Sequence, residues 1–161
     1  MRRGLLFGAL LLSVPAAARD SLGIWNSWGA FADAGVPRCY AIAMADPVEG
    51  RSNEFQPYFT VGTWPRRGAR SEVHVRLSHR LGSASTVTLT VGTERFLLVA
   101  GAADAWAQDR RMDAAIVAAM RSAISMTVSA QSAAGRPFRE SYALTGAATA
   151  MDAALLGCAQ T

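Results

Sequence analysis

Residues 72–78, Glu-Val-His-Val-Arg-Leu-Ser, alternate polar and apolar side chains without interruption. Residues 86–91, Thr-Val-Thr-Leu-Thr-Val, repeat this alternation, and residues 124–129, Ile-Ser-Met-Thr-Val-Ser, show it a third time. Successive side chains of a strand point to opposite faces, so a period of two predicts strands with one buried face. These stretches predict a mainly β protein.

Further strands of less regular pattern surround these three. They are expected at residues 39–45, 57–63, 95–99 and 138–144. Turn-forming residues separate them, at 46–47, 64–68, 81–83 and 135–137. Many short strands between such turns predict an antiparallel β-sandwich in which each sheet has one buried face.

Two segments follow a helical period instead. Residues 112–121 carry one apolar stripe, formed by Met112, Ile116 and Met120. Asp109 or Asp113 is expected to cap the start of this helix. The alanine-rich residues 147–156 predict a second short helix that ends at Gly157, a residue typical of helix C-termini.

The N-terminal eighteen residues have the pattern of a secretory signal peptide. Arg2 and Arg3 precede the apolar residues 4–14, and Pro15 separates that run from small residues ending at Ala18. The run is about half the ~20 residues that span a bilayer, so no transmembrane anchor is expected after cleavage. The sequence predicts export, with a mature chain that starts at Arg19.

The remaining 143 residues suit one domain, residues 19–161, with a single core. All sixteen basic residues are arginine, and removing Arg2 and Arg3 leaves fourteen against twelve acidic residues. A net charge of about +2 provides few phosphate contacts. We therefore expect no nucleic-acid partner.

The chain has two cysteines, Cys39 and Cys158, near the two ends of the mature domain. In an exported protein such a pair predicts a disulfide. The spacing does not match a Cys-x-x-Cys redox motif, and two thiols are too few for a structural zinc site. The bond would attach the last helix to the first strands.

The sequence contains no recognisable catalytic, metal or phosphate-binding motif. His74 and His79 lie an odd number of residues apart on one strand, so their side chains should point to opposite faces rather than share a metal. Asp104, Asp109 and Asp113 lie close in sequence, and capping and turn formation explain them. We expect no cofactor and no catalytic residues.

Residues 64–70, Trp-Pro-Arg-Arg-Gly-Ala-Arg, are the most suggestive local stretch. Trp64 with Arg66, Arg67 and Arg70 could hold an anionic group such as a lipid phosphate or a carboxylate. The alternative is a solvated hairpin loop whose tryptophan covers the edge of the sandwich.

Three aromatic residues, Trp25, Trp28 and Phe31, lie near the start of the mature chain. They are expected to be core residues of the first strand, because aromatic side chains supply much of the apolar area of a small domain. The alternative is an exposed contact strip.

The order of these features resembles the invasion-associated locus B family, small exported proteins of Gram-negative bacteria. The matching landmarks are Trp25, Trp28, Phe31, residues 38–41 (Arg-Cys-Tyr-Ala), 87–89 (Val-Thr-Leu), 96–98 (Phe-Leu-Leu), Ala105-Trp106, 116–121 and 142–146 (Tyr-Ala-Leu-Thr-Gly). The resemblance implies an immunoglobulin-like β-sandwich. The resemblance implies no catalytic residues, and it gives only weak support for a role in host invasion.

Together these observations predict an exported periplasmic or secreted protein that acts as a non-enzymatic binding or accessory module. An envelope protein or an anionic envelope component is the expected partner. Two alternatives stay open: an envelope enzyme whose site involves His74, His79, Asp104 or Asp109, and a chaperone-like assembly factor that pairs an exposed strand edge with a client.

Overall fold

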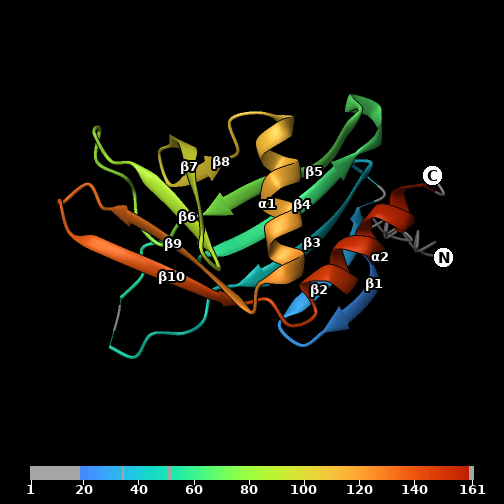
Figure 1. Ribbon diagram of the computed structural model, residues 1–161, viewed down its shortest axis with the longest axis horizontal. Helices are drawn as coiled ribbons and strands as arrows, with labels where there is room; N and C mark the ends of the chain where they lie inside the picture. The colour runs from blue at the N-terminus through green and yellow to red at the C-terminus, as the bar shows by residue number, and fades with distance from the viewer. Residues whose placement is uncertain (1–18, 34, 51, 160–161) are drawn as a thin grey trace, which may run out of the picture.

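Ten antiparallel strands pair in one unbroken series in the computed structural model, which describes residues 19–33, 35–50 and 52–159 (Figure 1). The strands are β1 Arg19–Trp25, β2 Trp28–Asp33, β3 Arg38–Met44, β4 Tyr58–Trp64, β5 Ala69–Arg76, β6 Val87–Val91, β7 Glu94–Gly101, β8 Asp104–Trp106, β9 Ser125–Gln131 and β10 Pro137–Ala143. The 3₁₀ turn η1 is Pro65–Arg67, and the helices are α1 Arg110–Ser122 and α2 Ala147–Ala159. The predicted signal peptide, residues 1–18, lies outside the described residues.

The strand order is β1-β2-β3-β4-β5-β8-β7-β6-β9-β10. The first five strands follow each other as a meander, and β8, β7 and β6 then return in reverse order. Strand β7 pairs with β6 through residues 94–98 and with β8 through residues 99–101. This change of partner within one strand lets the sheet curl.

The expectation of a mainly β, antiparallel domain with two short helices is confirmed. A sandwich of two separate sheets with immunoglobulin-like topology is not confirmed, because pairing continues through all ten strands of the described chain. The period-two pattern had predicted the alternation of buried and exposed residues. It carried no information on which strands are neighbours.

Hydrogen bonds join the last strand to the first half of the sheet. The indole Nε1 of Trp28 on β2 donates to the Ala143 carbonyl, which ends β10, at 2.8 Å. The Asp46 backbone N–H, after β3, donates to the Ser141 carbonyl at 2.8 Å. The curled sheet thus brings β10 close to strands far from it in the pairing order.

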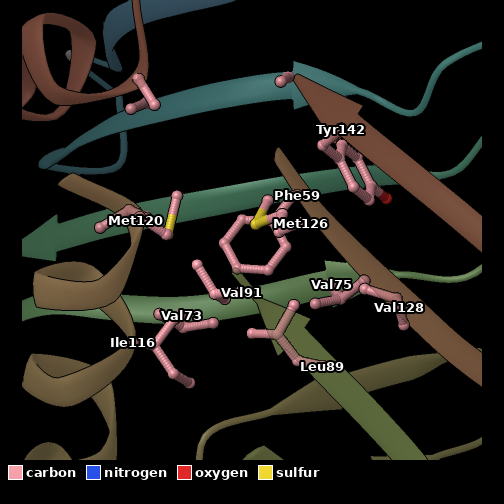
Figure 2. Packing of buried hydrophobic residues seen from close by; sticks show 14 of the residues in the cluster. Phe59, Val73, Val75, Leu89, Val91, Ile116, Met120, Met126, Val128 and Tyr142 are labelled. Atoms are coloured by element: carbon pink, nitrogen blue, oxygen red, sulfur yellow. The ribbon is translucent and has the colours of Figure 1, made fainter. Parts of the chain in front are cut away.

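The core lies inside this curl. Figure 2 shows Phe59 of β4, Val75 of β5, Leu89 of β6, Val128 of β9 and Tyr142 of β10 pointing toward one another. Ile116 and Met120 of α1 enter the same cluster and are buried, and Met112 packs against it, so the predicted apolar stripe is confirmed.

One of the two aspartates predicted to cap helix α1 does so. Asp109 is the N-cap, and its carboxylate accepts the Met112 backbone N–H at 2.8 Å. Asp113, the other candidate, is buried and accepts the Val73 backbone N–H of β5 at 2.8 Å. One aspartate therefore starts the helix, and the other attaches it to the sheet.

The buried Asp113 should make stability depend on pH. Burial, together with the charges of Glu72 and Asp109, raises the pKa of Asp113 above its ordinary value of 3.8, although the Val73 N–H opposes the shift. The folded state therefore binds more protons between the ordinary and the raised value. The contribution of this group to the free energy of unfolding is present below the ordinary pKa and is lost as the pH rises through the raised one.

Thermal melts of the wild type and Asp113→Asn at pH 7 and pH 4 measure this contribution, because asparagine keeps an acceptor but does not titrate. We expect the wild type to gain stability relative to the variant at the lower pH. A stability difference that stays constant with pH would contradict the expectation.

Helix α2 packs against β1, β2, β3 and β4, which places the last helix beside the first strands (Figure 1). The predicted disulfide is confirmed: Cys158 of α2 bonds to Cys39 of β3, and both are buried. The predicted helix end at Gly157 is wrong, because α2 continues to Ala159. Gly157 instead allows close approach to β1, since a Cβ there would lie 2.6 Å from Leu22 Cδ1.

Within the described ranges, no helix is both long and apolar enough to cross a membrane.

Candidate functional site

The face of the sheet that points away from the core carries a groove of about 590 Å³. Its floor and walls come mainly from the outward-facing positions of β3, β4, β5 and β8. Arg19 of β1 and Arg67 of η1 also line it. Ligand sites typically have volumes of this order. We call this hollow the outer-face groove.

Strand register determines which side chains adjoin in the groove. Gly62 of β4 lies between Tyr40 of β3 and Glu72 of β5. In the next row, Thr60 lies between Ile42 of β3 and His74 of β5. Ile42, Thr60 and Gly62 therefore form the floor, and Gly62 leaves its centre without a side chain.

Arginine and aromatic side chains form one wall. The Arg38 guanidinium carbon lies 4.6 Å from the ring centre of Tyr40 and 5.2 Å from that of Trp64. Arg67 lies 5.3 Å from the Trp64 ring centre, and Phe31 lies 5.9 Å from Tyr40 between ring centres. Cation–π attraction favours this arrangement. We call these five residues the arginine–aromatic ladder.

The two arginines of the ladder differ in their charge partners. Arg38 donates to Asp33 at 2.7 Å, and Arg19 lies 3.5 Å from the same carboxylate. Arg67 is exposed and forms no ion pair with the described residues. Its guanidinium is therefore available to an anion.

Three rings form the second wall, which we call the ring cluster. The His74 ring lies between those of Tyr58 and Trp106, at centre distances of 5.8 and 5.3 Å. Trp106 lines the groove and remains 38% exposed. The groove thus has aromatic side chains in both walls.

Asp104 holds the ring cluster in place. Its carboxylate oxygens lie 2.9 Å from His74 Nε2 and 2.6 Å from Arg76 Nη1. Arg76 in turn lies 4.3 Å from the ring centre of Phe55. A carboxylate shared by two cationic or polar groups restrains the imidazole, and through it the neighbouring rings.

The structure separates the four residues predicted to contact an anionic partner. Trp64 and Arg67 line the groove. Arg66 is exposed on η1 outside it, and Arg70 lines a different hollow beside α1 with Arg110 and Arg121. The predicted loop thus contributes two residues, rather than four, to one surface.

The three N-terminal aromatic residues also have different places. Trp28 is fully buried in the core, and Trp25 is partly buried against it. Phe31 faces outward and contacts Tyr40 in the ladder. The core interpretation thus describes Trp28 best, whereas Phe31 belongs to the groove side of β2.

Of the residues considered for catalysis, only His74 and Asp104 come together. His79 packs on Phe138 with ring centres 5.3 Å apart, and Asp109 caps α1. Within the described ranges, no group of three or more histidine, cysteine, aspartate or glutamate side chains is arranged to hold a metal ion.

A buried polar cluster lies between β5 and β10. Glu140 is 3% exposed and accepts the Ser78 backbone N–H, which follows β5. Burial, with added effects of Glu140 and Asp46, raises the pKa of Tyr142 far above its ordinary value of 10.0. The adjoining hollow is only about 20 Å³, too small for a ligand. The cluster therefore ties the two strands together.

Sequence reasoning missed most of the groove, including Arg38, Tyr40, Tyr58 and Trp106. Residues 38–44, Arg-Cys-Tyr-Ala-Ile-Ala-Met, do not alternate polar and apolar side chains, so the sequence does not indicate which of them face outward. A glycine at position 62, within a predicted strand, was the available signal for a close approach from outside.

Comparison of the chain with family models, curated proteins and solved structures finds no match. The site therefore carries the functional argument.

Proposed function

We propose that this protein is an exported, envelope-associated binding module without catalytic activity, of the invasion-associated locus B type, and that its ligand binds in the outer-face groove. The observation that carries this proposal is the groove itself. It combines aromatic walls, a floor that carries no side chain at Gly62 and an arginine, Arg67, without an ion-pair partner among the described residues.

The groove is well placed for binding because it lies on central strands. Strands β3, β4 and β5 each pair with neighbours on both sides, so the residues of the floor are held by the sheet. Sites built on such elements keep their geometry better than sites on loops. Little ordering is then needed when a ligand binds.

Two features support an extracytoplasmic location. The buried Cys39–Cys158 disulfide is consistent with an oxidising compartment. The N-terminal eighteen residues have the composition of a signal peptide. Periplasmic or secreted residence in a Gram-negative envelope is the corresponding proposal.

The edges of the sheet favour groove binding over strand addition to a client. Edge strand β10 starts with Pro137, which cannot donate a backbone hydrogen bond, and its Ser141 carbonyl already accepts from Asp46. Edge strand β1 is interrupted by a register shift between Ser21 and Gly23. Such features hinder the pairing of an edge strand with a strand from another chain.

A second candidate function is an envelope hydrolase that uses His74 as acid or base. The observation in its favour is the 2.9 Å contact with Asp104 at the groove. Incubation with the captured ligand distinguishes the two candidates: a hydrolase should cleave it and His74→Gln should abolish the cleavage, whereas a binding module should leave the ligand intact in wild type and variant alike.

Gly62→Val tests the binding proposal. A Cβ at position 62 would have no neighbour closer than 3.5 Å, and the backbone there is not in the left-handed region. The Cβ of valine therefore fits at the floor, and the substitution should raise stability by up to about 1 kcal/mol, because glycine is unfavourable inside a strand. Ligand capture should be lost.

The measurement is in-cell photo-crosslinking from a probe at Thr60, with adducts identified by mass spectrometry. Thr88→Val, a β-branched substitution on the distant strand β6, is the matched control and should leave the adducts unchanged. If the Thr60 probe forms no adduct, or if Gly62→Val leaves the adduct intact, the groove is not the binding site.

A further inference from the structure

We propose that the outer-face groove binds an acidic oligosaccharide, a chain of sugar rings that carry carboxylate groups. This assignment rests on the proposed binding function and names its ligand class. Two sets of groups carry it: ring faces on both sides of the floor, and guanidinium groups at one end.

The aromatic side chains supply flat apolar surfaces for sugar rings. Trp64 stands on one side of the floor, and Tyr58 and Trp106 stand on the other. Tyr40 is only 5% exposed and supports the Trp64 side through its contact with Arg38. The C–H groups of a pyranose face carry partial positive charge and pack on the electron-rich face of an aromatic ring. Thr60 and Glu72, which also line the groove, offer partners for sugar hydroxyl groups.

The charges at the groove favour an anionic ligand. Arg19, Arg38 and Arg67 line it, while Glu72 is the one carboxylate among its lining residues. Arg67 has no ion-pair partner among the described residues, and its contact with Trp64 holds the guanidinium beside a ring face. A planar guanidinium binds a carboxylate through two parallel hydrogen bonds. One sugar ring on Trp64 can therefore place its carboxylate at Arg67.

The fold disfavours two other anionic ligands. An extended acidic peptide gains much of its affinity from backbone hydrogen bonds to a free strand edge, and the floor strands β3 and β4 have no free edge. A lipid requires an enclosed apolar channel or a membrane-facing apolar surface. The groove is open, and polar or charged residues make up half of its lining.

The test is calorimetric titration of the whole mature protein with trigalacturonic acid and with its fully methyl-esterified trimer. The ester keeps the rings and removes the charges. We expect the acid to bind at least tenfold more tightly than the ester. Arg67→Gln should weaken binding of the acid by about ten- to a hundredfold and leave binding of the ester unchanged.

Arg66→Gln is the matched control, because Arg66 lies next to Arg67 on the same turn but outside the groove. It should leave the affinity for the acid unchanged. Equal losses in the two arginine variants would indicate diffuse charge attraction and overturn the proposal. Equal affinity for acid and ester, or no binding of the acid at millimolar concentration, would also overturn it.

Further titrations separate this assignment from the proposed function. If hexaglutamate or vesicles of anionic phospholipid bind and Gly62→Val prevents it, while the uronate does not bind, the groove is a binding site for another ligand class. In that case the proposed function stands and the oligosaccharide assignment fails. Absence of any adduct from the Thr60 probe in the otherwise wild-type protein would remove both.

Discussion

Removal of the disulfide in Cys39→Ala/Cys158→Ala is expected to lower the free energy of unfolding by about 5 kcal/mol. The bond closes a loop with a sequence separation of 119 residues, so it removes much conformational freedom from the unfolded chain. Domains of this size have a total stability of about 5–15 kcal/mol. The variant should therefore be close to unfolding at physiological temperature.

The effect should be largest at helix α2. This helix contacts the first four strands, and Cys158 lies one residue before its end. Its only ion pair among the described residues joins Asp152 to Arg121 and is half exposed, so it adds little. Hydrogen exchange should show weak protection of α2 before the rest of the fold opens.

Urea denaturation of the oxidised wild type, the reduced wild type and the double variant measures the loss. Reduction should destabilise the wild type by nearly as much as the substitutions do, and it should leave the double variant unchanged. Identical midpoints for oxidised and reduced wild type would show that the bond does not constrain the unfolded chain.

Trp28→Ala is expected to cost about 4 kcal/mol, from the lost apolar area and the cavity that remains. Trp28 is fully buried, and its ring contacts Phe59 edge-on at 6.3 Å between centres. Its Nε1 also donates to the Ala143 carbonyl at 2.8 Å, which alanine cannot replace. The substitution therefore weakens the contact between β2 and β10.

Two further variants separate the contributions of apolar packing and of the hydrogen bond to this loss of stability. Trp28→Phe keeps most of the apolar volume but no donor, so it should cost about 1–2 kcal/mol. Trp106→Ala removes the same type of side chain from the exposed groove wall and should cost less than the core variant. Urea midpoints of the three variants give the comparison. If Trp28→Ala and Trp106→Ala cost the same, Trp28 is not a core anchor.

These effects arise on the inner face of the sheet, whereas the proposed ligand contacts lie on the outer face. A strand presents both faces at once, so Cys39 and Ala41 pack inward while Arg38 and Tyr40 point into the groove. Substitutions at the exposed Arg67 should therefore change binding with little effect on stability.

Local sequence patterns predicted most of the strands and both helices. The alternation over 72–78 corresponds to β5, and that over 86–91 corresponds to β6. The apolar stripe that includes Ile116 corresponds to the buried face of α1. These predictions succeed because period and propensity are local properties of the chain.

Local patterns did not predict the elements whose bounds depend on tertiary contacts. Gly157 suggested a helix end, but packing against Leu22 and the bond at Cys158 keep α2 helical through it. Strand β8, only Asp104–Trp106, is too short to show a period, and it is defined by its pairing with β5 and β7.

The candidate site shows the same division. The cluster of Arg66, Arg67 and Arg70 suggested a single site for an anionic partner. In the structure, Arg67 of η1 lines the groove, whereas Arg70 of β5 lines the hollow beside α1. The directions of these two side chains depend on the turn η1, which ends at Gly68 with a φ of 60°. Nearness in sequence did not predict nearness in space.

The sequence by itself determined the mainly β class, the two helices, the disulfide pair and the outward orientation of residues such as Glu72 and His74. Only the tertiary structure decided that these outward side chains share one groove. The period-two alternation of the sequence shows on which face of a strand a residue lies. Which strands are neighbours depends instead on pairing between segments far apart in the chain. The pairing of β5 with β8, which brings His74 beside Trp106, is such a contact.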